Sequence, residues 1–168
     1  MVKAKVCMLG AFSVGKTSLV SRYVYSMFSE KYLTTVGVKI DKKVVGAGAR
    51  EVTLVIWDLY GEDSVQAVNT SYLRGTSGYL LVVDGTRPET LAVADRLRRR
   101  VIESVGDVPF VLLLNKSDLT EDWRLSEEAL APWRTIGCPI LRTSAKSGVG
   151  IEDAFTTLAD GLLEPSHE

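Results

Sequence analysis

A chain of 168 residues, of which 46% are hydrophobic and 24% are charged, is expected to fold as one domain spanning residues 1–168. Its formal net charge of −1 argues against general electrostatic binding to nucleic acid or to a membrane surface. We expect no signal peptide, and no apolar run approaches the roughly 20 residues that a membrane-spanning helix needs.

The first segments predict a strand, a loop and a helix. Lys5–Leu9 is almost continuously apolar, as in a buried strand, and apolar residues from Leu19 to Met27 recur with helical spacing. Between them, Gly10–Thr17 reads GAFSVGKT and matches the phosphate-binding pattern G-x-x-x-x-G-K-T. The glycines let successive N–H groups turn toward an anion, Lys16 can reach phosphate oxygens, and the Thr17 hydroxyl can bind Mg²⁺. The alternative is a glycine-containing surface turn, but the flanking strand and helix favour phosphate binding.

The next segments predict an antiparallel hairpin at the edge of a sheet. Alternating residues from Val36 to Asp41 indicate a strand with one face in water, the face that carries Lys39 and Asp41. Gly46–Ala49 supplies a turn into the apolar strand Val52–Trp57. The lysines of the first strand suit an exposed edge: Lys39, Lys42 and Lys43.

The second half alternates strands with helices. Ser126 is expected to begin a helix that Pro132 ends or kinks early. The alternation predicts a three-layer α/β fold with a mostly parallel sheet, whose ligands bind beyond the carboxyl ends of the strands. The expected strands are Tyr79–Val83, Phe110–Leu114 and Ile140–Arg142, and the expected helices run through Leu91–Val101 and Ile151–Leu162.

Three short motifs follow expected strands. Asp58–Gly61 reads DLYG, and an aspartate near bound phosphate can support Mg²⁺. Asn115–Asp118 reads NKSD; the Asp118 carboxylate can accept two hydrogen bonds that guanine donates and adenine cannot. Ser144–Lys146 reads SAK, and a backbone N–H there can reach guanine O6. Each motif alone could be an ordinary polar turn, but after a phosphate-binding loop that interpretation loses weight.

The phosphate-binding loop and these three motifs, in this order, resemble the Ras-like small GTPase family over essentially the whole chain. The resemblance implies a six-stranded sheet with one antiparallel edge strand and helices on both faces. It also implies a switch that binds GTP or GDP with Mg²⁺, hydrolyses GTP slowly, and meets effector, exchange-factor and activator proteins through its switch loops, Glu30–Val38 and Asp58–Leu73. The implied metal ligands are Thr17 and Thr35, and Asp58 is implied to support the metal. The implied catalytic positions are Lys16, Thr35, Gly61 and Glu62. The implied nucleotide contacts are Ser13, Val14, Gly15, Lys16, Thr17, Ser18, Phe28, Tyr32, Thr35, Gly61, Asn115, Lys116, Asp118, Ser144, Ala145 and Lys146.

Three residues depart from the family pattern beside the expected γ-phosphate. Glu62 stands where the family usually has a glutamine that orients the attacking water. Tyr60 replaces a usual alanine, and Phe12 replaces a small residue. We therefore expect altered, slow hydrolysis. A GTP-binding interaction module that hardly hydrolyses GTP is the alternative, and an ATP-using enzyme is a second one that Asp118 argues against.

The remaining features favour a cytoplasmic protein without a lipid anchor. Val2 excludes N-myristoylation, no cysteine ends the chain, and Cys7 and Cys138 are expected to be buried free thiols in a reducing compartment. The segment Tyr32–Gly37 is most similar to the Rab-like branch, which usually carries such a C-terminal cysteine. Nothing in Glu30–Thr35 supplies an arginine to the γ-phosphate; the later candidates are Arg74 and Arg87, which the sequence does not place. The arginines at 96, 98, 99 and 100 are expected on a solvated helix face, and at least one of Trp123 and Trp133 in the core.

Overall fold

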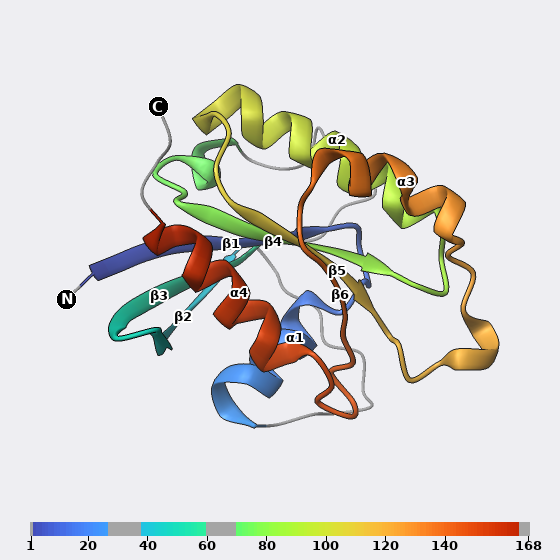
Figure 1. The fold of residues 1–168 in the computed structure, drawn as a ribbon, viewed down its shortest axis with the longest axis horizontal. Helices are drawn as coiled ribbons and strands as arrows, with labels where there is room; N and C mark the ends of the chain where they lie inside the picture. Colours follow the sequence, from blue (N-terminus) through green and yellow to red (C-terminus); the bar gives the residue numbers. More distant parts are fainter. Residues whose placement is uncertain (1, 27–37, 60–69, 165–168) are drawn as a thin grey trace.

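The computed structural model describes residues 2–26, 38–59 and 70–164 of the chain, and within these ranges the elements form one sheet flanked by helices (Figure 1). The strands are β1 (Val2–Gly10), β2 (Val38–Ala47), β3 (Arg50–Leu59), β4 (Gly78–Asp84), β5 (Phe110–Asn115) and β6 (Ile140–Arg142). The helices are α1 (Lys16–Tyr25), α2 (Glu89–Val105), α3 (Glu127–Ile136) and α4 (Ile151–Leu163), with short 3₁₀ helices at Thr70–Leu73 and Thr120–Asp122.

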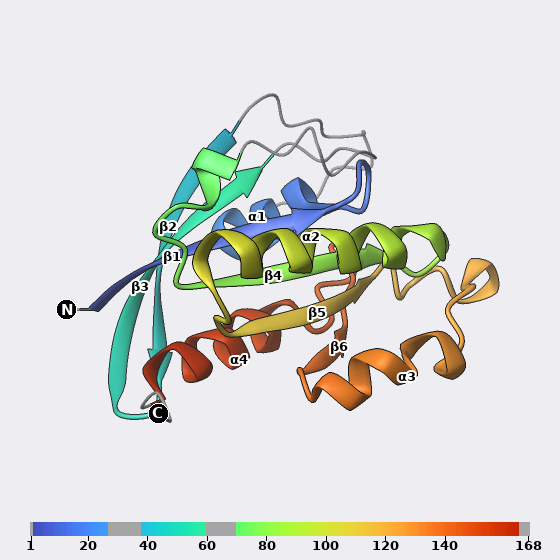
Figure 2. The ribbon, with the colours of Figure 1, turned by 90° about the horizontal axis from the view of Figure 1, so that it is seen from above.

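In the described part of the chain the sheet has six strands, in the order β2-β3-β1-β4-β5-β6 (Figure 2). Only the edge strand β2 is antiparallel to its neighbour; β1 lies between β3 and β4 and is parallel to both. The pairs β4–β5 and β5–β6 are parallel as well. This arrangement confirms the predicted fold class. The prediction succeeded because strands that are apolar on both faces need helices on both sides to cover them.

The helices divide between the two faces of the sheet. In Figure 1, α2 and α3 lie on one side and α1 and α4 on the other. Tyr23 of α1 stacks on Phe155 of α4, with ring centroids 3.8 Å apart. On the other face, Phe110 of β5 meets the edge of Trp133 of α3 at 6.4 Å. Burying such an aromatic side chain contributes about 2–3 kcal/mol, so these pairs fix the helices against the sheet.

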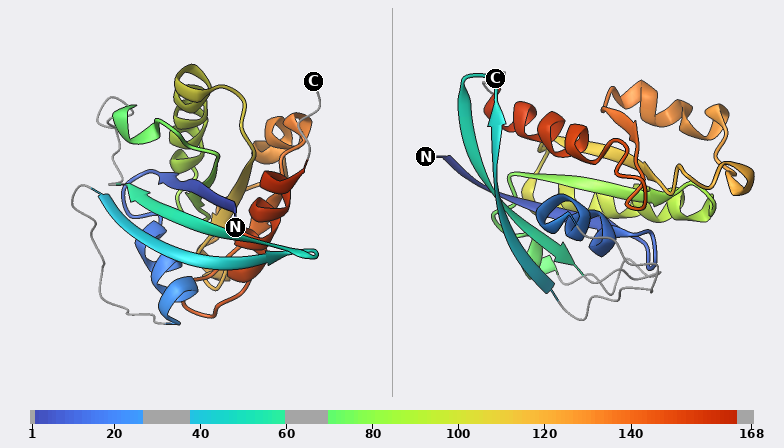
Figure 3. Two further views of the ribbon diagram at one scale, coloured as in Figure 1. Left: turned by 90° about the vertical axis from the view of Figure 1, so that its left-hand side faces the viewer. Right: turned by 90° about the horizontal axis from the view of Figure 1, so that it is seen from below.

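The hairpin β2–β3 forms one border of the molecule, as Figure 3 shows, and it corrects two details of the sequence prediction. The pairing continues to Ala47 opposite Arg50, so the turn is shorter than predicted. The predicted solvent face is also wrong at two positions, since Ile40 is 47% exposed and Asp41 is 7% exposed, whereas Lys39 is exposed as predicted. Asp41 is buried because its carboxylate accepts a hydrogen bond from the Tyr25 hydroxyl at the end of α1. The contact with α1 decides which face is covered.

Helix α3 begins as predicted and ends later than predicted. The Ser126 hydroxyl accepts the Ala129 N–H at 3.1 Å, which is an N-cap. Pro132 lies inside the helix, which continues to Ile136, so of the two predicted effects of Pro132, an early end or a kink, the early end is wrong. Burial of Leu130 and Trp133 on both sides of the proline stabilises the helix beyond it.

Replacing Pro132 by alanine should raise the free energy of unfolding by about 2 kcal/mol. The change restores a backbone donor inside α3 and removes a ring that crowds the preceding turn. A smaller loss of stability opposes this gain, because the unfolded chain becomes more flexible without the proline. Urea denaturation measures the difference. Pro88→Ala is the matched control, because Pro88 precedes the hydrogen-bonded part of α2 and should give no gain. A Pro132→Ala chain no more stable than the parent would contradict the prediction that Pro132 destabilises the folded protein.

Other side chains follow the sequence predictions closely. Both cysteines are free thiols as predicted; Cys7 is buried, whereas Cys138 is half-buried and so more exposed than predicted. Burial raises the pKa of both thiols. Trp133 is buried and Trp123 half-buried. Of the arginine run on α2, Arg96 and Arg99 are exposed and the other two are half-buried, so this helix face is largely solvated.

Candidate functional site

The motifs found in the sequence converge on one edge of the sheet. The loop Gly10–Thr17 follows β1, Asp58 lies near the end of β3, Asn115 ends β5, and Ser144 follows β6. Because these four strands are parallel, their carboxyl ends meet at the same edge, where α/β proteins bind ligands. In Figure 2, β1, β4 and β5 all end on the same side of the molecule.

The loop between β1 and α1 needs both of its glycines. Gly15 has φ of +101°, and a side chain there would meet the Asn115 amide at 2.4 Å. A Cβ on Gly10 would lie 2.5 Å from the Val82 carbonyl oxygen of the neighbouring strand. Ser13 also adopts a left-handed conformation, with φ of +68°. Alternating handedness of this kind turns neighbouring N–H groups toward one side, which forms an anion-binding concavity.

Lys16 is held inside this loop by two of its carbonyl groups. Its Nζ donates to Gly10 O and to Ala11 O, each at 3.3 Å, and the residue is 6% exposed. Burial lowers the pKa of Lys16 to about 8, an effect that the Asp58 carboxylate partly offsets. The ammonium group is therefore positioned across the loop, where an anion would satisfy it.

Thr17 and Asp58 form the part of the site suited to a metal ion. The Thr17 hydroxyl donates to Asp58 Oδ2 at 2.6 Å, and Asp58 is fully buried. Within the described residues there is no cluster of three or more His, Cys, Asp or Glu side chains that would hold a metal by itself. A hydroxyl and one carboxylate fit Mg²⁺, which takes few protein oxygens and completes its shell with phosphate and water.

Asn115 connects two of the loops. Its Nδ2 donates to Val14 O at 2.8 Å, and its Oδ1 accepts from Thr143 Oγ1 at 3.0 Å. Asn115 is 2% exposed, so both contacts lie away from water. The residue therefore serves to fix the phosphate-binding loop and the loop after β6 relative to each other.

Asp118 and the SAK segment lie side by side. The Ser144 hydroxyl donates to Asp118 Oδ1 at 2.8 Å and accepts the Ser147 N–H at 3.1 Å. The Ser144 N–H donates to Val149 O at 3.0 Å. Asp118 is exposed, so its carboxylate is oriented by Ser144 while remaining accessible to a ligand.

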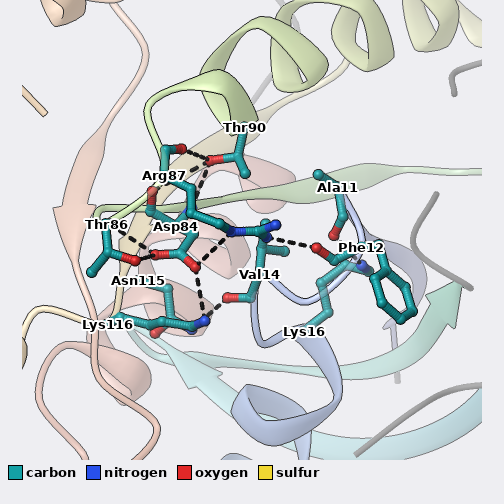
Figure 4. Close-up of polar contacts among 10 residues, drawn as sticks. All are labelled: Ala11, Phe12, Val14, Lys16, Asp84, Thr86, Arg87, Thr90, Asn115 and Lys116. Carbon is teal, nitrogen blue, oxygen red and sulfur yellow. Dashed lines mark hydrogen bonds and ion pairs between the residues drawn. The ribbon is translucent and has the colours of Figure 1, made fainter. Parts of the chain in front are cut away.

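Three residues that the sequence analysis did not assign to the site also belong to it. Asp84 at the end of β4 accepts from Lys116 Nζ at 2.7 Å, and Arg87 bonds both Asp84 and the phosphate-binding loop (Figure 4). Arg22 of α1 donates to Ala145 O and Lys146 O. Asp84 directly follows a predicted strand, so its position was a usable signal. Arg22 lies in the middle of a helix and gave none.

Several predicted site residues lie outside the described part of the chain, and their roles remain predictions. They are Phe28, Tyr32, Thr35, Tyr60, Gly61 and Glu62, with most of both switch loops.

Comparison with known proteins decides the family. A sequence profile described as Ras family matches residues 5–164. The chain belongs to the Ras family. It is 34% identical over 167 residues to the mouse (Mus musculus) Ras-related protein Rab-7b, covering 96% of this chain and 83% of that protein. It is 35% identical to the Drosophila melanogaster Ras-related protein Rab7, covering 95% and 80%, and 34% identical to human (Homo sapiens) Rab-7b, covering 96% and 83%.

Family membership establishes the general activity of this Ras-family protein. It is a small GTPase, a guanine-nucleotide-binding switch that acts with regulator or effector proteins. Among the described residues, no helix is both long and apolar enough to cross a bilayer.

Proposed function

We propose that this Ras-family protein is a single domain, residues 1–168, that binds GTP and GDP with Mg²⁺ and hydrolyses GTP slowly. The observation that carries the proposal is the meeting of four segments at one sheet edge: Gly10–Thr17 at the end of β1, Asp58 near the end of β3, Asn115–Asp118 at the end of β5 and Ser144–Lys146 after β6. Each segment supplies a chemistry that one part of a guanine nucleotide requires. The free thiols fit a reducing, cytoplasmic compartment.

The phosphate groups would bind in the concavity of the loop after β1. The N–H groups of residues 13–18 and the positive end of α1 favour the anion. Lys16, already held across the loop, would turn its ammonium group from the two carbonyls to phosphate oxygens. Bound Mg²⁺ would neutralise phosphate charge, and we assign Thr17, Asp58 and Thr35 to holding it.

The base would bind against Asp118 and the SAK segment. The Asp118 carboxylate accepts from the two guanine donors, and the stem of Lys116 lies along the base. The Ser144 N–H is already bonded to Val149 O, so the donor to guanine O6 comes from the backbone of Ala145 or Lys146. Phe28 and Tyr32 are proposed to border the nucleotide from the first switch loop.

Hydrolysis would proceed by in-line attack of water on the γ-phosphate. Lys16 neutralises the charge that develops on the phosphate, and Gly61 supplies a backbone N–H. Glu62 can accept a hydrogen bond from the water but cannot donate one to the phosphate as glutamine does. The switch loops read the γ-phosphate, which gives effectors, exchange factors and activators two distinguishable states.

Phe12 should make the protein resistant to an activator that inserts an arginine beside the γ-phosphate. Its bulk stands at the third loop position, where a small residue leaves room. Single-turnover GTP hydrolysis should be slow in the parent and change less than about twofold with such an activator. In Phe12→Gly the activator should raise the hydrolysis rate at least about tenfold, because an inserted arginine can accelerate hydrolysis by far more than that. The variant should keep its nucleotide affinity.

Phe12→Leu is the matched control, since it keeps a bulky side chain and should remain resistant. Analysis of the bound nucleotide in the same assay separates slow turnover from a pure GTP-binding module, which would retain GTP throughout. A parent chain that hydrolyses GTP quickly alone would contradict the proposal and indicate Glu62 as a working base. Equal competition by ATP and GTP would favour the ATP-using alternative.

A further inference from the structure

Arg87, which follows β4, reaches across to the phosphate-binding loop (Figure 4). Its Nη2 donates to the Phe12 carbonyl oxygen at 2.6 Å, and its Nε donates to Asp84 Oδ2 at 3.1 Å. Hydrogen bonds from a charged donor are shorter and stronger than neutral ones. The guanidinium group therefore connects a loop backbone atom to a side chain on a different strand.

The contact with Phe12 fixes the orientation of a whole peptide unit. The Phe12 carbonyl and the Ser13 N–H belong to the same planar trans peptide, so they point in opposite directions. Holding the carbonyl toward Arg87 therefore directs the Ser13 N–H away from Arg87. An N–H group fixed in this direction is one that an anionic phosphate would accept from.

The backbone at Ser13 makes such an external contact useful. Its φ of +68° is in the left-handed region, which a serine adopts only against a steric cost. Rotation of the peptide between Phe12 and Ser13 would relieve that cost and change the direction of the N–H. Asn115 holds the Val14 carbonyl in the same way at 2.8 Å, next to Gly15, which has no such cost.

Asp84 anchors Arg87 and also joins it to the base-binding side. The Asp84 side chain is 1% exposed and accepts from Lys116 Nζ at 2.7 Å as well as from Arg87. Thr86 donates to Oδ1 through its N–H at 2.8 Å and its hydroxyl at 2.7 Å. Burial opposes ionisation of this carboxyl, but the hydrogen bonds from Lys116 and Thr86 hold its pKa below the usual value.

We propose that Arg87 is a positioning residue for phosphate binding, which holds the Phe12–Ser13 peptide with its N–H toward the nucleotide phosphates. Asp84 fixes Arg87 and Lys116 together, so the phosphate-binding and base-binding halves share one buried carboxylate. The inference rests on the proposed function of this site as a guanine-nucleotide site.

Arg87→Met tests the proposal, because methionine keeps a long side chain and loses every donor. Release of fluorescent GDP and of a non-hydrolysable GTP analogue should become about 10–100-fold faster, the size of a lost charged hydrogen bond. Competition by guanosine, which has no phosphate, should change less than about twofold. Arg87→Lys should recover part of the loss, and Arg134→Met, which changes an exposed side chain of α3, should match the parent.

A second background tests the peptide mechanism itself. Ser13→Gly removes the cost of the left-handed conformation, so Arg87→Met should have an effect at least about threefold smaller in Ser13→Gly than in the parent. Equal effects in the two backgrounds, unchanged GDP release, or an equal loss of guanosine binding would each overturn the proposal. A parent chain that fails to bind GDP would instead refute the proposed function, so the two failures are distinguishable.

Discussion

Asp118→Asn should lower the affinity for GDP by about 10²–10³-fold and raise the affinity for xanthosine diphosphate. In the proposed site the Asp118 carboxylate accepts from two guanine donors, and each hydrogen bond to a charged group is worth about 1.5–3 kcal/mol. Xanthine carries an oxygen where guanine carries its amino group, and an asparagine amide can donate to that oxygen. Equilibrium binding of both diphosphates by the parent and the variant measures the exchange of specificity.

Asp122→Asn is the matched control for this change. Asp122 is an exposed aspartate four residues away, in the 3₁₀ helix Thr120–Asp122, and its replacement should leave both affinities unchanged. Ser144→Ala should lower the affinity for GDP by less than Asp118→Asn does, because it removes the hydroxyl that donates to Asp118 at 2.8 Å and orients it. Unchanged GDP affinity in Asp118→Asn would remove Asp118 from the base-binding site.

Thr17→Asn should weaken binding of the Mg²⁺-triphosphate complex by at least about tenfold, with a smaller effect on the diphosphate. Loss of a residue that only hydrogen-bonds to a metal ligand already lowers metal affinity by about tenfold or more, and this change would remove the proposed ligand itself. The structure adds a second reason, since the Thr17 hydroxyl donates to buried Asp58 at 2.6 Å. Titrating Mg²⁺ against nucleotide release, with GTP analogue and with GDP, measures both effects.

Thr17→Ser provides the control because it keeps the hydroxyl and removes only a methyl group. It should retain Mg²⁺ dependence close to that of the parent. If Thr17→Asn kept both the Mg²⁺ dependence and the preference between the two nucleotides, the assignment of Thr17 and Asp58 to the metal would be wrong.

The layers and the sheet were predictable because their signals are local. Runs such as Tyr79–Val83 are apolar on both faces, which only a covered sheet permits, and the structure places this segment within β4. Parallel strands have their carboxyl ends at one edge, so motifs that follow different strands had to meet. That rule places Thr17 and Asp58 at one edge, and the pairing of β1 with β3 brings them into contact.

Other features failed to follow from local signals because distant contacts oppose them. The alternation around Ile40 and Asp41 indicated the wrong solvent face, since the Tyr25 hydroxyl on another element stabilises the buried carboxylate. Pro132 normally ends a helix, yet burial of Trp133 outweighs the lost hydrogen bond. In both cases a contact between elements overrides a preference within one element.

The sequence by itself determined the order of the loops and the type of ligand, because glycine, lysine and aspartate at fixed spacing carry their chemistry wherever the chain folds in this way. Only the tertiary structure decided how those loops are held. Arg87 is 75 residues from Phe12 along the chain, and its bond to that carbonyl exists because β1 and β4 are neighbours in the sheet. Hydrogen bonds to backbone carbonyls depend on position rather than residue type, so the sequence of the loop does not record which side chain holds it.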